Sequence, residues 1–237
     1  MKVLVTGDSH TAALVRGLAA LKSAGELDPA VELTVRRLGS GQLLVTPFWR
    51  AETDRAELVE PTYRRHMTRL PPEDHLDAIG LCMPMWPMRV VRRIVSGGNC
   101  LVEPEPDRQA ISQALFRNVV LRDQRYVLGL FEHLKAIGIS TFAVSAPGMF
   151  RDHFNPQVMK PAAALGLFQA YRKLMAAELD VRKIPLVDVP SECLDDDGFM
   201  RAEFRHPAPG DAHHANTAFG EMMVLALQRF ALANRGV

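Results

Sequence analysis

Two short segments near opposite ends of the chain carry the residue types of nucleophilic catalysis. The first is Gly7-Asp8-Ser9-His10, and the second is Asp211-Ala212-His213-His214. A serine hydroxyl is a weak nucleophile until a neighbouring imidazole takes its proton. Asp211 and His214 lie three positions apart, which lets the carboxylate hold the ring Nδ1–H and leaves Nε2 facing the serine. We therefore expect Ser9 as nucleophile, His214 as base and Asp211 as the orienting acid, with the adjacent His213 as the alternative base.

These segments resemble the first and last sequence blocks of the SGNH (GDSL-type) hydrolase family, in which Gly-Asp-Ser holds the nucleophile and Asp-x-x-His completes the triad. The resemblance spans most of the chain, because Ser9 and Asp211 lie 202 positions apart (211 − 9). It departs from the family where His10 replaces the usual Leu after the serine. The resemblance implies a serine esterase or acyltransferase that forms a covalent acyl-enzyme without a metal or an organic cofactor. Small-molecule or glycan esters, such as acetylated carbohydrates, are the expected substrates.

An oxyanion that forms during ester cleavage needs two or three hydrogen-bond donors. The resemblance implies the Ser9 N–H, a glycine after the second strand and an asparagine after the third. Gly41 is the better match for the glycine, and Gly39 is close behind. The family's Gly-x-Asn-Asp is missing from Leu81–Trp86, so we assign the asparagine to Asn99, which arrives later in the chain and could equally belong to a plain turn.

Three further residues are expected to contact the substrate. Asp8 and His10 flank the serine, and Arg151 follows the fourth expected strand. A guanidinium at that sheet edge is suited to an anionic group of the substrate. The alternative for Arg151 is a surface ion pair with Asp152, which contributes little to stability.

The elements that must position these residues are short apolar strands alternating with longer segments of helical period, which is typical of an α/β fold with helices on both faces of a parallel sheet. We expect strands at 2–6, 31–36, 76–83, 141–145 and 185–189. Helices are expected at 11–24, 107–137, 160–181 and 216–234. The resemblance implies a three-layer α/β/α domain with a five-stranded parallel sheet in the flavodoxin-like order 2-1-3-4-5.

Composition narrows the class of protein further. The chain has 237 residues, 48% hydrophobic and 23% charged, and we expect one domain, 1–237, with a lid or insertion at 42–74. A net charge of +1 lacks the surplus positive field that nucleic-acid binding uses. No apolar run is long enough for a membrane span or a signal peptide. The three cysteines are an odd number and show no Cys-x-x-Cys spacing, which suits reduced thiols, so we expect the protein in the cytoplasm. Nothing in the sequence indicates an oligomeric state.

Three alternative functions can be compared with the sequence. A dinucleotide-binding dehydrogenase would need glycines where His10 and Ala13 stand. A metallohydrolase would use His206, Asp211, His213 and His214, but a ligand set confined to one loop is unusual. A non-catalytic domain that binds a glycan or a protein is the third alternative. The Gly-x-Ser-x-Gly elbow of α/β-hydrolases is absent from the sequence.

Overall fold

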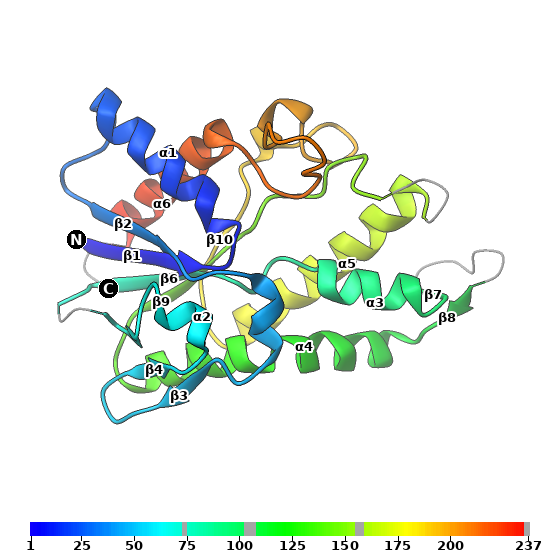
Figure 1. The fold of residues 1–237 in the computed structure, drawn as a ribbon, viewed down its shortest axis with the longest axis horizontal. Helices are drawn as coiled ribbons and strands as arrows, with labels where there is room; N and C mark the ends of the chain where they lie inside the picture. The colour runs from blue at the N-terminus through cyan, green and yellow to red at the C-terminus, as the bar shows by residue number, and fades with distance from the viewer. Residues whose placement is uncertain (73–74, 102–107, 155–158, 235–237) are drawn as a thin grey trace.

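The computed structural model describes residues 1–72, 75–101, 108–154 and 159–234. Its centre is a five-stranded parallel sheet in the spatial order β10-β9-β6-β1-β2 (Figure 1). The strands are β1 (Lys2–Gly7), β2 (Glu32–Arg37), β6 (Ala78–Cys82), β9 (Thr141–Val144) and β10 (Leu186–Val187). Counted along the chain this is the order 2-1-3-4-5, so the expected α/β fold and sheet order are confirmed. The last strand is shorter than expected because the Asp188 carboxylate takes the Val189 N–H, at 2.7 Å.

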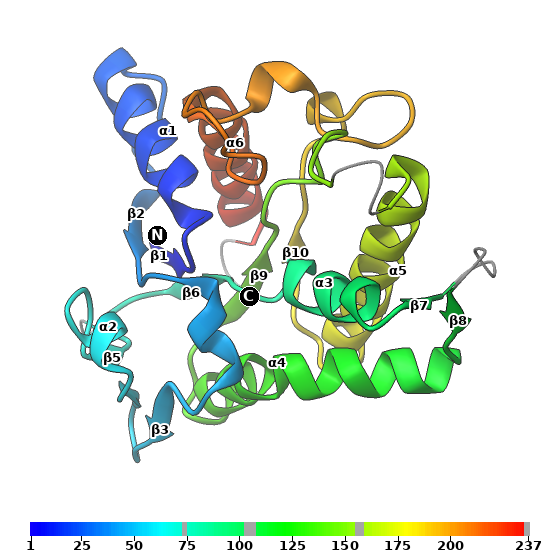
Figure 2. The same cartoon turned by 45° about the vertical axis from the view of Figure 1, so that its right-hand side comes forward.

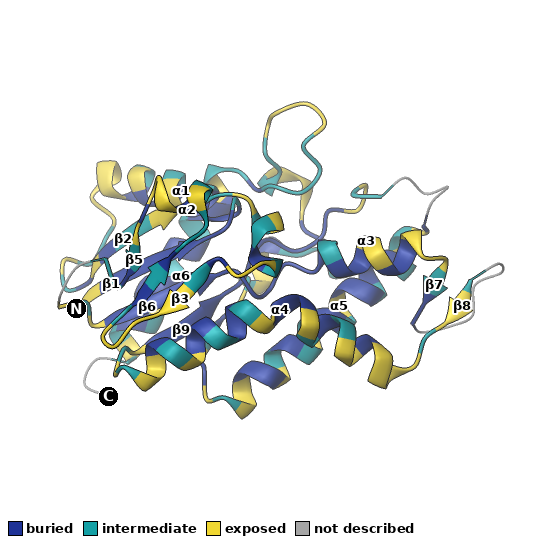
Figure 3. Ribbon diagram, turned by 60° about the horizontal axis from the view of Figure 1, so that its bottom comes forward, coloured by how far each residue is buried: buried dark blue, intermediate teal, exposed yellow. Residues whose placement is uncertain are grey.

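Both faces of the sheet are buried, as a parallel sheet requires. Successive side chains point to opposite faces, so Val3 and Val5 join one apolar core while Leu4 joins the other. Helices α1 (Thr11–Ala24) and α6 (Thr217–Ala233) cover the first face. Helices α3 (Met88–Ser96), α4 (Gln113–Ala136) and α5 (Pro161–Val181) cover the second, as Figure 2 shows. Figure 3 shows the strands as a buried middle layer and the outer helix faces exposed.

Two helix predictions needed correction. The segment 107–137 was expected to be helical throughout, but α4 begins only at Gln113. The Ser112 hydroxyl accepts the Leu115 N–H at 3.1 Å and so caps the helix at that point. Asp107 lies outside the described residues. Helix α3 was not predicted, although the buried pattern Val90, Val91, Ile94 and Val95 has helical spacing. None of the helices in the described ranges is long and apolar enough to cross a membrane.

Where an insertion was expected at 42–74, the described segment 41–72 forms a small antiparallel subsheet. It contains a 3₁₀ turn (Gly41–Val45), β3 (Trp49–Ala51), β4 (Ala56–Leu58), the short helix α2 (Pro61–Arg64) and β5 (Arg69–Leu70). Phe48 and Leu58 of this subsheet are fully buried in the core beneath α4, and Trp49 Nε1 donates to the Tyr126 carbonyl of α4 at 2.8 Å. The segment is therefore an insertion that completes the core, and a lid function for it stays a prediction.

Helices α1 and α6 touch backbone to backbone. A Cβ on Gly17 would lie 2.2 Å from the Gly220 carbonyl carbon, and one on Gly220 would lie 1.9 Å from the Ala13 carbonyl oxygen. Only glycine permits this approach. Because Ser9 lies just before α1 and His214 just before α6, the crossing brings the two ends of the chain together at the carboxyl edge of the sheet.

Candidate active site

Ser9 lies in the tight connection between β1 and α1. Gly7 ends the strand against β6, where a Cβ would lie 2.1 Å from the Cys82 carbonyl oxygen. The Asp8 N–H then donates to that same carbonyl at 3.2 Å, and the Thr11 N–H donates to the Asp8 carbonyl at 3.1 Å as the helix begins. This turn lifts Ser9 above the carboxyl ends of the strands, where ligands of open α/β sheets bind.

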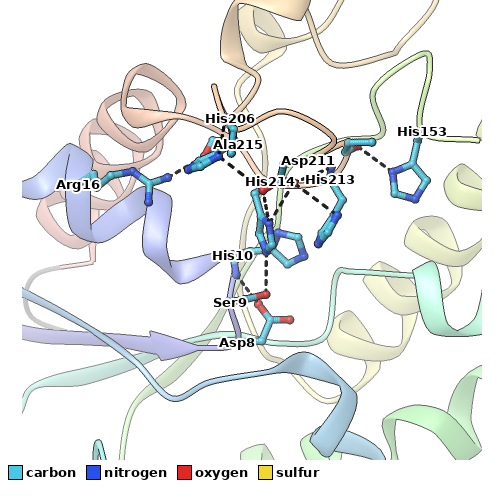
Figure 4. Close-up of polar contacts among 12 residues, drawn as sticks. Asp8, Ser9, His10, Arg16, His153, His206, Asp211, His213, His214 and Ala215 are labelled. Atoms are coloured by element: carbon cyan, nitrogen blue, oxygen red, sulfur yellow. Dashed lines mark hydrogen bonds and ion pairs between the residues drawn. The ribbon is translucent and has the colours of Figure 1, made fainter.

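The structure brings Ser9, His214 and Asp211 into one hydrogen-bonded chain (Figure 4). Ser9 Oγ lies 3.0 Å from His214 Nε2. On the other side of the ring, His214 Nδ1 lies 2.9 Å from Asp211 Oδ2. Both distances are in normal hydrogen-bond range, and a carboxylate on Nδ1 fixes the tautomer whose Nε2 lone pair faces the hydroxyl. The arrangement is able to move a proton from serine to histidine.

The loop that presents the imidazole is held from several sides. The His206 N–H donates to the His214 carbonyl at 3.0 Å, and Arg16 Nη2 donates to the Ala215 carbonyl at 2.9 Å. Asn216 caps α6 by accepting the Phe219 N–H at 3.1 Å. These bonds fix the loop relative to both α1 and α6, so the imidazole is positioned before any ligand arrives.

The Asp211 carboxylate accepts several hydrogen bonds from its own loop. Its Oδ1 accepts the N–H groups of His213 and His214, at 3.2 and 3.0 Å, in addition to the ring contact. Partial burial alone would raise the pKa of Asp211, but the backbone and ring donors of His214 outweigh it and hold the pKa well below its usual range. Asp211 therefore stays ionised across the neutral range.

His213, the alternative base, points elsewhere. Its Nδ1 lies 3.5 Å from Asp211 Oδ1, and its ring packs on the His214 ring with a centroid distance of 4.0 Å. In the described ranges it makes no hydrogen bond to Ser9, which contacts His214 instead. Burial, and next the neighbouring His214, lower the pKa of His213, so this ring favours the neutral form.

The two residues that flank the serine are both buried. Asp8 is 2% exposed and lies beneath the serine, where its Oδ1 accepts the His10 N–H at 2.9 Å. Burial raises the pKa of Asp8 to about 7, against the opposing effects of that bond and of Arg89. His10 is 3% exposed and packs against Trp86 with the rings tilted and 4.2 Å between their centroids, and its Nδ1 has no partner among the described residues. His10 lines the cavity beside Ser9, whereas Asp8 supports the site from below.

The expected oxyanion donors have different outcomes. In the described part of the chain, the N–H groups of Ser9 and Gly41 have no hydrogen-bond partner. Gly41 lies against the serine turn, since a Cβ on it would be 2.8 Å from Asp8 Oδ2, and its carbonyl accepts from Arg89 Nη1 at 2.6 Å. Arg89 in turn pairs with Asp123, with Nη2 2.7 Å from Oδ2, and both side chains are buried. The loop that carries the Gly41 N–H is thus held from behind by a buried ion pair.

Asn99 is not at the site. It begins β7 (Asn99–Cys100), which pairs with β8 (Gln109–Ala110) beyond the end of α3 that lies farther from α1 (Figure 2). Its Nδ2 donates to the Gly97 carbonyl at 3.0 Å, as in a plain turn. Asn99 was expected as an oxyanion donor because it follows the third strand in the sequence, but helix α3 lies between the end of β6 and this residue.

Arg151 is also directed away from the serine. Its Nη2 lies 2.8 Å from Asp195 Oδ2 and 2.7 Å from Asp197 Oδ2, and its guanidinium lies over the Phe199 ring. It lines a separate cavity that does not include Ser9. Two acids occupy the group that was expected to bind a substrate anion, and neither of them is the expected partner Asp152, which pairs with Arg205 instead.

The cavity beside Ser9 has a volume of about 230 Å³. Arg16 and Arg37 line it together with Ser9, His10 and His214, and sequence reasoning missed both arginines. The sequence did contain a signal for Arg16. It follows Ser9 by seven residues, about two turns of a helix, so the two residues are expected on the same side of α1. Arg37 ends β2 beside Gly7 of β1, which only the strand register reveals.

One group of side chains in the described ranges has the types and spacing to hold a metal ion. Asp211, His213 and His214 each offer a ligand atom, and these atoms lie within 4.8 Å of one another. They are three of the four residues of the metallohydrolase alternative. Asp211 and His214 are also engaged in the hydrogen-bonded chain with Ser9, so a cation bound by them would compete with those hydrogen bonds.

Three of the solved structures with the same fold carry the names of ester hydrolases. An inferred acylhydrolase from Bacteroides fragilis is 12% identical with a TM-score of 0.55, over 98% of this chain and 86% of that one. A GDSL-like lipase from Bacteroides thetaiotaomicron is 14% identical with a TM-score of 0.51, over 98% and 87%. A carbohydrate acetylesterase family member from Sinorhizobium meliloti is 12% identical with a TM-score of 0.51, over the full length of both.

No protein-family model and no curated protein matches the sequence. The structural likeness covers nearly the whole chain, and at these identities it establishes the fold of GDSL-type hydrolases and not the reaction.

Proposed function

We propose that the protein is a serine esterase, or an acyltransferase of the same mechanism, with Ser9 as nucleophile. The observation that carries the proposal is the 3.0 Å contact between Ser9 Oγ and His214 Nε2, combined with the 2.9 Å contact between His214 Nδ1 and Asp211 Oδ2. Three residues from two ends of the chain meet with the polarity that proton transfer requires. A hydrogen bond with a purely structural role between Ser9 and His214 would not require the ionised Asp211 on the other side of the imidazole.

In the proposed reaction, Ser9 Oγ attacks the ester carbonyl while His214 Nε2 takes its proton. Asp211 stays ionised and stabilises the imidazolium. The negative charge on the former carbonyl oxygen is stabilised by the free N–H groups of Ser9 and Gly41. As the tetrahedral intermediate collapses, the bond to the alcohol oxygen breaks and His214 returns the proton to that oxygen, leaving an acyl-Ser9 ester.

The second half of the reaction runs the same steps with a new acceptor. Water or a second hydroxyl loses its proton to His214 and attacks the acyl carbonyl, and Ser9 leaves with that proton. Hydrolysis results from water, and acyl transfer results from another alcohol. A cavity of about 230 Å³ beside the serine suits a short acyl group, such as an acetyl on a small molecule or a glycan.

We also propose that the enzyme is cytoplasmic. The buried free thiols of Cys82, Cys100 and Cys193 are consistent with a reducing compartment.

The test combines active-site labelling with ester hydrolysis. A fluorophosphonate probe should label the wild-type protein at Ser9 and should fail to label Ser9→Ala. With p-nitrophenyl acetate, His214→Gln should lower kcat by several orders of magnitude, and the matched variant His213→Gln should retain most of the rate.

Each alternative gives a different result in these assays. Equal losses in both histidine variants would transfer the role of base to His213. Activity abolished by EDTA and restored by Zn²⁺ would favour the metal reaction at Asp211, His213 and His214. A folded protein that neither reacts with the probe nor cleaves the ester would favour the non-catalytic binding domain.

A further inference from the structure

The small cavity at the nucleophile has an unusual charge. Two guanidinium groups, those of Arg16 and Arg37, line the same 230 Å³ space as Ser9 and His214. The one carboxylate that lines it, Asp211, is already engaged by hydrogen bonds from His214 and His213. With two arginines against one carboxylate, the lining therefore has an excess of one positive charge.

Arg16 is aimed at the site by the geometry of α1. Helical side chains lean toward the N-terminus of the helix, so the Arg16 side chain points back along α1 toward Ser9. Arg16 lies five residues after Thr11, the first residue of α1, which is about 7.5 Å along the helix axis. One N–H, from Nη2, binds the Ala215 carbonyl, as Figure 4 shows, which holds the guanidinium at the cavity wall.

Arg37 reaches the cavity from the other side. It is the last residue of β2 and lies directly opposite Gly7 of β1, two residues before the nucleophile. In the described ranges, the backbone of Arg37 pairs in the sheet, but its exposed guanidinium has no hydrogen bond and no ion pair. This is the opposite of Arg151, whose guanidinium is bound by two aspartates.

An arginine without a partner beside a nucleophile, as Arg37 is, points to a charged substrate, because the planar guanidinium matches a carboxylate through two parallel hydrogen bonds. Resting on the esterase proposed above, we propose that the natural substrate is an ester that carries a carboxylate a few bonds from the reacting carbonyl, and that Arg37, with Arg16, binds this carboxylate. The spacer between the two groups should be short, because Ser9 and both arginines line one cavity of only about 230 Å³.

The test compares two esters of the same shape. Monoethyl succinate carries a terminal carboxylate, and ethyl levulinate has a methyl ketone in its place. We expect kcat/KM about tenfold higher for monoethyl succinate, the size of one charge-assisted hydrogen bond in a half-open site. The ratio should approach one in Arg37→Met and should fall with added salt. Arg37 is the informative position, because Arg16 also holds the loop of His214.

Arg151→Met is the matched control, because the sequence made Arg151 the expected anion ligand. The preference for monoethyl succinate should persist in that variant. A preference that is absent from the wild-type enzyme, or that survives Arg37→Met and disappears in Arg151→Met, overturns the proposal.

A binding experiment separates this proposal from the catalytic one. Calorimetric titration of Ser9→Ala with the two esters needs no turnover. Tighter binding of monoethyl succinate, lost when Arg37→Met is added, supports the anion site even if no ester is hydrolysed. Hydrolysis of ethyl levulinate that depends on Ser9, together with equal binding of the two esters, leaves the esterase standing and refutes the anion site.

Discussion

The contact between α1 and α6 should set the distance between the proposed nucleophile, Ser9, and the proposed base, His214, and Gly220→Ala tests this. The new Cβ would lie 1.9 Å from the Ala13 carbonyl oxygen, whereas ordinary contact begins at 3.4 Å, so the helices must separate by about 1.5 Å (3.4 − 1.9). The obstacle is backbone and cannot rotate away. Overpacking of this kind costs about 1–3 kcal/mol. The shift would also stretch the 3.0 Å bond between Ser9 Oγ and His214 Nε2 beyond hydrogen-bond range.

A displacement of this size near a reacting pair lowers rates by about a hundredfold. We therefore expect Gly220→Ala to reduce kcat/KM for p-nitrophenyl acetate by about that factor and to lower Tm by several degrees. Gly166→Ala is the control, because Gly166 is inside α5 and its added Cβ would meet nothing within 4 Å. That variant should gain about 0.5–1 kcal/mol and keep its rate. Wild-type kcat/KM and Tm in Gly220→Ala would refute the reasoning.

Three further predictions follow from the buried and ionised groups of the site. Burial raises the pKa of Asp8 to about 7, so the native carboxyl retains a proton that the unfolded chain loses near pH 4, and stability falls as pH rises between these values. Asp8→Asn removes this loss, and its advantage in unfolding free energy over wild type should grow by about 2–3 kcal/mol from pH 5 to pH 8 in urea titrations; an advantage independent of pH would contradict the assignment. Arg89→Met leaves the buried Asp123 carboxylate unpaired and should cost about 3–5 kcal/mol by the same assay, and a loss below about 1 kcal/mol would show that the pair is dispensable. Asp211→Asn removes the ionised partner of His214 and should lower kcat by about 10³–10⁴-fold with Tm little changed, whereas a near-normal kcat would exclude Asp211 from the proton relay.

Much of the fold and the relay could be predicted because the signals are local. Apolar runs such as Val3–Val5 mark a strand buried on both faces, and the helix expected at 11–24 has the bounds observed for α1. The Asp-x-x-His spacing needs one turn of chain to place Asp211 on the His214 ring, so it could be read without the rest of the protein. The serine turn likewise follows from Gly-Asp-Ser at the end of a strand.

Tertiary structure alone decided which side chains surround this relay. Asn99 and Arg151 have suitable chemistry and follow suitable strands, but an intervening helix removes one and two aspartates occupy the other. Strand register places Arg37 at the cavity beside Ser9, whereas Asp8 is buried next to Gly41 and does not line that cavity. Contacts between residues distant in sequence depend on how helices and strands pack, and periodicity along the chain carries no information about that packing.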